Sequence, residues 1–207
     1  MIEALYKEYQ NKECDDKEAL AQLAAKLDGK KVLLLGPGRN AAREADRIRA
    51  LITEEKPAVI AINYIPKTLK PDALFLTNSH RYLQMSSQLT KPENQELSII
   101  ATSNITEAER PFTYVVNYSN LIDEEAEFMD NSMMMLIRLL EKIGVKQVEL
   151  AGFDGYTPDD VNYFDENMEY SFVKEKADSL NESGRKFFRE MVDRMKIDFV
   201  TESYYQG

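Results

Sequence analysis

The sequence predicts an α/β fold with a doubly wound, mostly parallel sheet and helices on both faces. Short, continuous apolar runs alternate along the chain with longer segments whose apolar residues recur at helical spacing. The run from Lys31 to Leu35 is followed by the turn Gly36-Pro37-Gly38, a helical segment and a second apolar run. This order of strand, glycine turn, helix and strand is typical of a Rossmann-like domain.

The N-terminal segment has apolar residues at helical spacing from Ile2 to Leu27, with a polar interruption between Asn11 and Asp16. This pattern predicts two helices around a linker. Asp28-Gly29 ends the second helix, because glycine adopts the left-handed conformation of a helix C-cap. We therefore divide the chain into an N-terminal helical linker, residues 1–28, and a Rossmann-like α/β domain, residues 29–207.

The remaining elements follow from the same two patterns. Continuous apolar runs are typical of parallel strands covered on both faces, and they predict strands at residues 58–62, 73–76, 97–101, 113–116, 147–151 and 197–200. Amphipathic spacing predicts helices at residues 41–55, 132–143 and 185–195. The methionine cluster at residues 129–135 fits this spacing, so we assign it to core packing.

Length, composition and charge exclude several classes of protein. A chain of 207 residues with 43% hydrophobic and 30% charged residues is typical of one globular domain. Its net charge of −10 repels a phosphate backbone, so we expect no nucleic-acid partner. No run approaches the roughly 20 apolar residues of a membrane-spanning helix, and the start lacks a signal-peptide pattern, so we expect a cytoplasmic protein without a membrane partner. Cys14 stands alone among acidic residues and receives no role.

Asparagines follow four of the predicted strands. Asn63, Asn78, Asn104 and Asn117 come directly or shortly after successive apolar runs. Ligands of open α/β sheets bind beyond the carboxyl ends of the strands, where these amides would donate and accept hydrogen bonds to hydroxyls, a base edge or a ribose. The alternative is that each asparagine only caps a turn.

The glycine turn indicates an anion site. Gly36 and Gly38 place flexible backbone before a helix N-terminus, where Arg39 and Asn40 follow, and free N–H groups with the helix dipole favour a phosphate there. The third glycine of the dinucleotide fingerprint and the lysine of a P-loop are both missing, which disfavours dinucleotide oxidoreduction and ATP hydrolysis. We therefore expect a small anionic molecule rather than either of those substrates.

Two titratable residues are candidates for chemistry. His80 is the sole histidine, which excludes a metal site built from several histidines and leaves His80 as a candidate general base. The alternative is a surface or hydrogen-bonded histidine. Asp154, which precedes Gly155, would bind a ribose or a metal, or would simply form a turn. We predict no metal site.

Several short motifs resemble bacterial lipooligosaccharide sialyltransferases. They are Lys31 to Gly38, Val59 to Asn63, Leu74 to Asn78, Asn131-Ser132, Val148 to Tyr156 and Asn162-Tyr163. This resemblance implies that Gly38, Asn63, Asn78 and Ser132 hold a cytidine nucleotide and that Tyr156 and Tyr163 hold its phosphate. Residues 178–184 contain no histidine at the place of the family's catalytic one, so a transferase would use His80 or a tyrosine as its base.

A second resemblance is closer over the whole length of the chain. Ile2 to Gln10, Asp15-Asp16 and Leu33 to Gly38 resemble the C-terminal domain of bacterial proteins similar to 4-hydroxy-2-oxovalerate aldolase and hydroxymethylglutaryl-CoA lyase. It implies an accessory domain whose partner is an aldolase-like barrel domain. The metal-dependent aldolase chemistry would belong to that barrel.

Together these patterns predict a domain that binds a nucleotide or nucleotide sugar, with its anion at residues 36–40 and its sugar or base at the asparagines. No other cofactor is predicted. Two rival interpretations are a glycosyltransferase that uses His80 or a tyrosine as base, and a noncatalytic docking domain whose asparagines are only caps.

Overall fold

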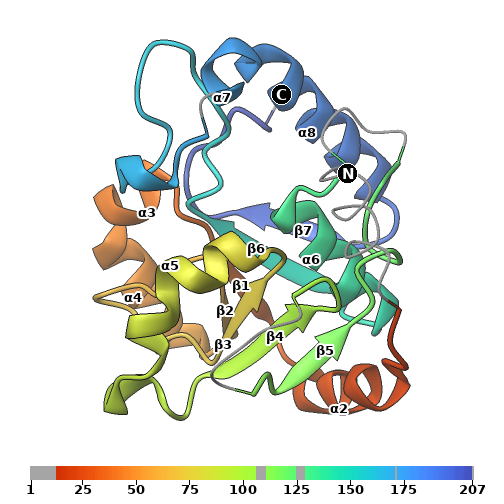
Figure 1. The fold of residues 1–207 in the computed structure, drawn as a ribbon. Coiled ribbons are helices and arrows are strands. Elements are labelled where there is room, and N and C mark those ends of the chain that lie inside the picture. The colour runs from red at the N-terminus through yellow and green to blue at the C-terminus, as the bar shows by residue number, and fades with distance from the viewer. Residues whose placement is uncertain (1–12, 106–110, 125–128, 171, 207) are drawn as a thin grey trace, which may run out of the picture.

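The computed structural model describes residues 13–105, 111–124, 129–170 and 172–206, and these form one seven-stranded sheet (Figure 1). Every strand pairing is parallel, which confirms the predicted doubly wound α/β fold. The strands are β1 (Val32–Leu35), β2 (Ala58–Ile62), β3 (Ala73–Leu76), β4 (Ser98–Thr102), β5 (Tyr114–Val116), β6 (Gln147–Ala151) and β7 (Lys196–Phe199).

The order of the strands creates a crevice at one place in the sheet. The order is β5-β4-β3-β2-β1-β6-β7, so the chain runs outward from β1 to β5 and returns to β6 on the other side of β1. Connections from β1 and β6 therefore diverge to opposite faces of the sheet. Such a switch point leaves a crevice at the carboxyl ends of the strands, where ligands of this fold class bind.

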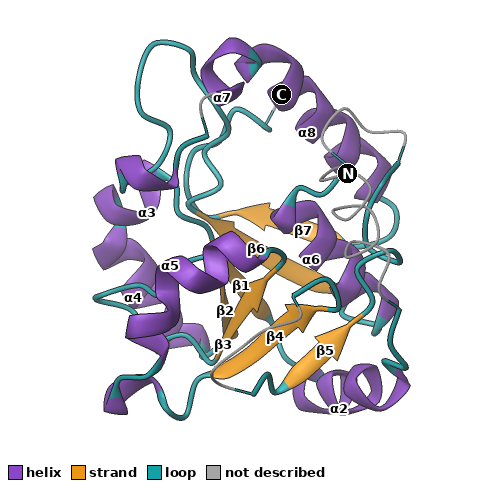
Figure 2. Ribbon diagram, in the orientation of Figure 1, coloured by secondary structure: helices purple, strands orange, loops and turns teal. Residues whose placement is uncertain are grey.

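Helices cover both faces of the sheet, as predicted (Figure 2). One face packs against α2 (Lys17–Leu27), α6 (Ser132–Lys142) and α8 (Ala177–Met191), and the other packs against α4 (Ala45–Glu55) and α5 (Ser79–Leu89). Side chains alternate between the two cores along each strand: Leu34 joins the first core and Leu33 the second. All four residues of β1 are buried, which explains why this strand has no polar positions.

The described part of the N-terminal segment packs against the sheet. Leu23 and Leu27 of α2 are buried in the core beneath β5. Asn117, which follows β5, binds the backbone of Cys14 through both ends of its amide, and its own N–H donates to Asp16. The first helix predicted for this segment falls mostly on residues 1–12, which lie outside the described residues.

Several helical stretches differ from the prediction. The segment 41–55 forms two helices, α3 (Arg39–Arg43) and α4, separated at Glu44. Helix α8 begins at Ala177, and α5 was not predicted at all. The buried apolar residues Tyr82, Met85 and Leu89 of α5 have helical spacing, but they are only three of its 11 residues, so its apolar stripe is thin. The short helix α7 (Phe172–Glu175) and the 3-10 turns Pro92–Asn94 and Glu166–Met168 complete the described elements.

Within the described residues, no helix is both long enough and apolar enough to cross a membrane.

Candidate functional site

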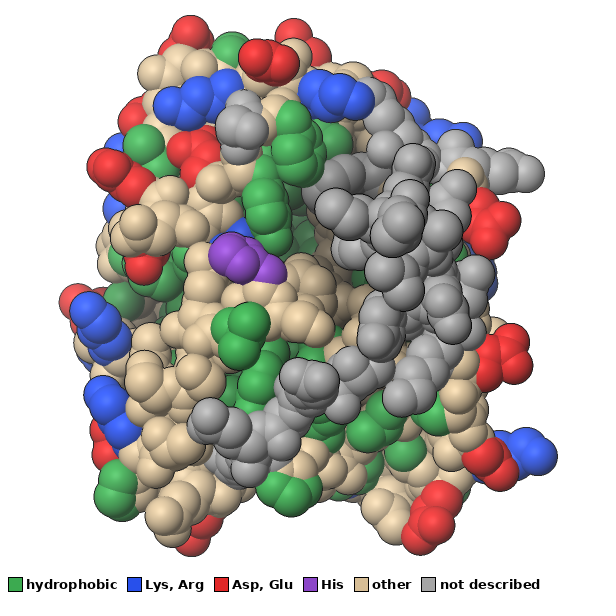
Figure 3. All heavy atoms as spheres, viewed as in Figure 1, with side chains coloured by type: hydrophobic (Ala, Val, Ile, Leu, Met, Phe, Trp, Pro, Cys, Tyr) green, Lys and Arg blue, Asp and Glu red, His purple; other side chains and the backbone are tan. Residues whose placement is uncertain are grey.

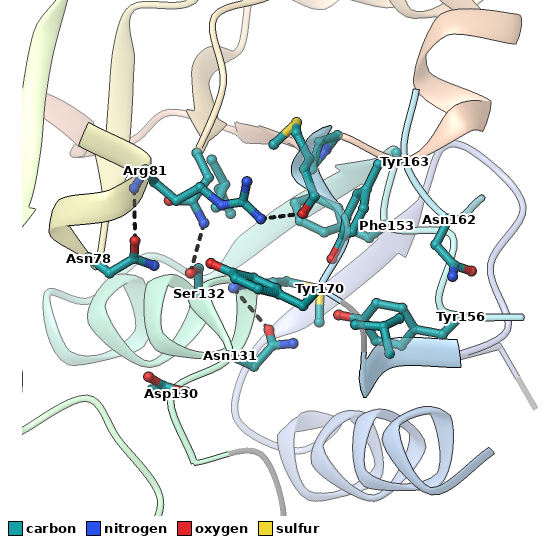
Figure 4. A pocket seen from close by; sticks show the side chains of 18 of the residues that line it. Asn78, Arg81, Asp130, Asn131, Ser132, Phe153, Tyr156, Asn162, Tyr163 and Tyr170 are labelled. Carbon is teal, nitrogen blue, oxygen red and sulfur yellow. Dashed lines mark hydrogen bonds between the residues drawn. The ribbon is translucent and has the colours of Figure 1, made fainter. Parts of the chain in front are cut away.

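A cavity of about 700 Å3 opens at the carboxyl edge of the sheet, over the switch point between β1 and β6 (Figure 4). Many of its lining residues were predicted from the sequence: Gly38, Asn63, Asn78, His80, Asn104, Ser132, Asp154, Tyr156 and Tyr163. The structure therefore brings together residues from the ends of five different strands or the loops that follow them. Gly36, Arg39, Asn40 and Asn117 were predicted as well, but they do not line this cavity.

The glycine turn after β1 packs directly against the loop after β6. The amide nitrogen of Gly36 lies 2.8 Å from the oxygen of Ala151, and that of Gly38 lies 2.8 Å from the oxygen of Gly152. A Cβ at Gly36 or Gly38 would lie 2.4 or 2.5 Å from the Gly152 oxygen. Both positions therefore require glycine because two backbones meet there, independently of any ligand.

The place predicted for an anion holds a carboxylate of the protein itself. Oδ2 of Asp154 accepts a hydrogen bond of 2.8 Å from the amide nitrogen of Asn40, in the first turn of α3. Burial raises the pKa of Asp154 to about 6, and the Asn40 hydrogen bond and the charge of Arg43 offset part of that rise. The other carboxylate oxygen, Oδ1, is buried and has no hydrogen-bond donor among the described residues.

Side chains at the start of α3 point away from the cavity. The Arg39 guanidinium pairs with Asp160 and with the carbonyl oxygen of Val161, and the Asn40 amide donates to the carbonyl of Glu202. The segment around Tyr163 covers the glycine turn from outside, because Tyr163 forms a backbone bridge with Gly38. The start of α3 is thus enclosed by the protein on two sides.

The end of β2 is connected to the start of α6. Asn63 adopts a left-handed conformation with φ of 61°, which asparagine tolerates better than most residues. Its Nδ2 donates to the Ser132 hydroxyl over 2.9 Å, and the Thr77 hydroxyl lies 2.7 Å from the same oxygen. The carbonyl oxygen of the Asn63 side chain is buried without a donor among the described residues. Asn63 and Ser132 therefore form one polar unit at the cavity wall.

The other asparagines have structural partners. Asn78 is the N-cap of α5 and accepts a hydrogen bond from the amide nitrogen of Arg81. Asn104 bridges the Thr77 carbonyl and the Thr102 hydroxyl. Both residues still line the cavity, whereas Asn117 fastens the backbone of Cys14. The capping interpretation thus describes Asn78 in part, whereas Asn117 holds a distant segment of backbone and does not cap its own turn.

A wall of tyrosines closes the cavity opposite α5. The rings of Tyr156 and Tyr163 are 6.5 Å apart in an edge-to-face arrangement, and Tyr205 lines the same cavity. Burial raises the pKa of all three tyrosines, well above the usual value for Tyr163 and Tyr205. These hydroxyls stay protonated at neutral pH, so they suit hydrogen-bond donation rather than general-base catalysis.

The lining residues that were not predicted include Arg81, Asn131, Tyr170 and Tyr205. Asn131 is the N-cap of α6 and accepts from the amide nitrogens of Met133 and Met134, a role that its position before Ser132 and an apolar helix indicates. Arg81 gave no signal, because the helix that carries it was not predicted. It is only 4% exposed and lies over the Tyr170 ring, 4.8 Å from its centroid.

His80 lies at the rim of the cavity, on the surface of the molecule (Figure 3). Among the described residues, no three histidine, cysteine or acidic side chains gather in a way that could hold a metal ion. No protein-family model matches this chain, and a search of curated proteins finds no match.

Proposed function

We propose that this domain binds a nucleotide or nucleotide sugar in the cavity at the carboxyl ends of its strands. The observation that carries the proposal is the convergence of Asn63, Asn78 and Ser132, from three separate segments, on one cavity at the switch point. Their amide and hydroxyl groups suit the hydroxyls of a ribose or the edge of a base. A volume of about 700 Å3 lies within the range of small-molecule sites.

The tyrosine wall supports the same class of ligand. Tyr156 and Tyr163 offer aromatic faces for a base or sugar and protonated hydroxyls for the oxygens of a phosphate. The first resemblance assigns these two tyrosines to phosphate binding. The second implies that the domain serves an aldolase-like barrel as an accessory unit, where a bound nucleotide would regulate the barrel or supply its substrate.

The proposal is tested by thermal unfolding in the presence of cytidine and uridine nucleotides and their sugar conjugates. A ligand at 100 times its dissociation constant stabilises a protein by about 2.7 kcal/mol. We expect the unfolding temperature to rise with at least one of these compounds, and Asn63→Ala should abolish this rise. Asn117→Ala is the matched control: it weakens the attachment of Cys14 but should leave the shift intact. No shift with any member would refute the proposal and favour a docking domain.

A glycosyltransferase is the second candidate function, and Asp154 is the observation that favours it. Asp154 lines the cavity with one carboxylate oxygen unpartnered among the described residues and a pKa of about 6. Asp154 would take the proton of an acceptor hydroxyl while the hydroxyl oxygen of the acceptor bonds to the anomeric carbon. The bond between that carbon and the nucleotide breaks, and the nucleotide leaves with the electron pair of that bond. The transfer rate should rise through pH 6 and be lost in Asp154→Asn; a flat profile would refute this role.

A further inference from the structure

We propose that the phosphate group of the ligand is bound by Arg81 between the starts of α5 and α6, and not at the glycine turn before α3. This inference rests on the proposed function for the class of ligand and locates its charged part within the cavity.

Arg81 is a buried cation without an acidic partner. Its guanidinium donates to the Gln84 side chain over 2.9 Å and to the Met168 carbonyl, which are both neutral acceptors. Within the described parts of the chain, Arg81 forms no ion pair. A buried charge is costly unless it is paired, and most of the five guanidinium donors remain for a ligand. Holding such a group beside a cavity favours an incoming anion.

Two helix N-termini support Arg81. Helices α5 and α6 each have 11 residues, and the first residues of both line the cavity: Ser79 and His80 in α5, Ser132 and Met133 in α6. The first N–H groups of a helix have no acceptor inside it, and the dipole makes this end positive. The Asn78 side chain accepts from the amide of Arg81, and the Asn131 side chain accepts from the amides of Met133 and Met134.

The stacked Tyr170 ring and the Met168 carbonyl hold the guanidinium in place, so little side-chain entropy is lost when an anion binds (Figure 4). A planar guanidinium matches two oxygens of a phosphate at once. The hydroxyls of Tyr156 and Tyr163, which line the same cavity, are protonated at neutral pH and can donate further hydrogen bonds to the ligand.

The two carboxylates that line the cavity lie away from the Arg81 guanidinium. Asp154 is engaged by the amide of Asn40 at α3, where its charge would repel a phosphate. Asp130 accepts a hydrogen bond from the Tyr118 hydroxyl, and Figure 4 places it on the far side of Asn131 from Arg81. The phosphate is therefore favoured near Arg81 and disfavoured near α3.

The test compares the affinities of cytidine monophosphate and cytidine, which differ only in the phosphate. We expect the wild-type protein to prefer the nucleotide at least about tenfold, as a charge-assisted contact implies. Arg81→Gln should reduce this preference to within about threefold while the affinity for cytidine stays constant. Arg43→Gln, which removes an exposed charge of α3, is the matched control and should keep the preference.

An unchanged preference in Arg81→Gln, or a preference lost in Arg43→Gln instead, would overturn the inference while the proposed function stands. If neither compound binds, the cytidine form of the proposed function fails. The role of Arg81 in anion binding is then tested by thermal unfolding with inorganic pyrophosphate. Stabilisation by pyrophosphate that Arg81→Gln removes would support the anion site, and its absence would overturn it. If Arg81→Gln does not fold, Arg81→Lys keeps the charge without the planar fork and should still lower the preference at least threefold.

Discussion

The starts of α3 and α5 both lie at the carboxyl edge of the sheet, but they differ in what faces them. At α3, the amide of Asn40 is bound to the Asp154 carboxylate, and the glycine turn is packed between two other segments. At α5, the buried Arg81 has neutral partners only and borders a cavity. A glycine turn before a helix is therefore not sufficient for an anion site, because the protein can supply the negative charge itself.

The largest effect should come from breaking the packing at α3. Gly152 has φ of +73°, and a Cβ there would lie 2.4 Å from the Gly36 oxygen and 2.6 Å from the Ala41 side chain. Gly152→Ala should therefore destabilise the protein by roughly 3 kcal/mol or more, measured by urea unfolding.

Gly144→Ala is the control for this change. Gly144 also has a positive φ, of +90°, but open space surrounds its Cβ position. It should cost only about 1 to 2 kcal/mol, the price of the left-handed conformation alone. Equal effects at the two positions would show that the close approach of the β1 and β6 loops contributes nothing.

An intermediate effect should come from the charge that faces α3. The pKa of Asp154 is raised from 3.8 to about 6, so the folded state binds more protons than the unfolded state between these values. Stability should fall as the pH rises from about 4 to about 6, and Asp154→Asn, which keeps an acceptor for Asn40, should remove this fall. After allowance for solvent screening, we expect Asp154→Asn to raise the free energy of unfolding by on the order of 1 to 2 kcal/mol at pH 7.5 and to change it little at pH 4.

The contribution of Asp160 to stability should change with pH in the opposite direction. The hydrogen bond from Arg39 lowers the pKa of Asp160, so its contribution is present at neutral pH and is lost on acidification. Asp160→Asn should therefore not raise stability at pH 7.5. A gain in both variants would indicate a general effect of net charge rather than the burial of Asp154.

The smallest effect should come from Arg39, which was predicted to bind an anion. Its ion pair with Asp160 is solvent-exposed, so Arg39→Gln should change the free energy of unfolding by about 0.5 kcal/mol or less. Ligand affinity should also remain unchanged, because Arg39 does not line the cavity. A tenfold loss of ligand affinity in Arg39→Gln would indicate instead that the anion binds at the start of α3.

The strands were the most predictable part of the molecule. β2, β3 and β6 were predicted to the residue, because strands buried on both faces are continuous apolar runs bounded by polar residues. Helix α5 was missed because only three of its 11 residues, Tyr82, Met85 and Leu89, are buried and apolar, and Arg81 was missed with it.

Within the site, similar sequence contexts had different outcomes. Asn63 and Asn117 both follow strands, but one contacts Ser132 at the cavity and the other binds Cys14, 103 residues away. Asp154 was predicted as a site residue, yet its bond to Asn40 spans 114 positions. Such partners depend on tertiary packing and are not visible in a local pattern.

The most direct test of this comparison is an NMR titration of the backbone amides with cytidine monophosphate. We expect the largest chemical-shift changes at Ser79, His80 and Ser132, with small changes from Gly38 to Ala41. Changes centred on residues 38–41, with α5 and α6 unaffected, would contradict it and place the phosphate at the glycine turn.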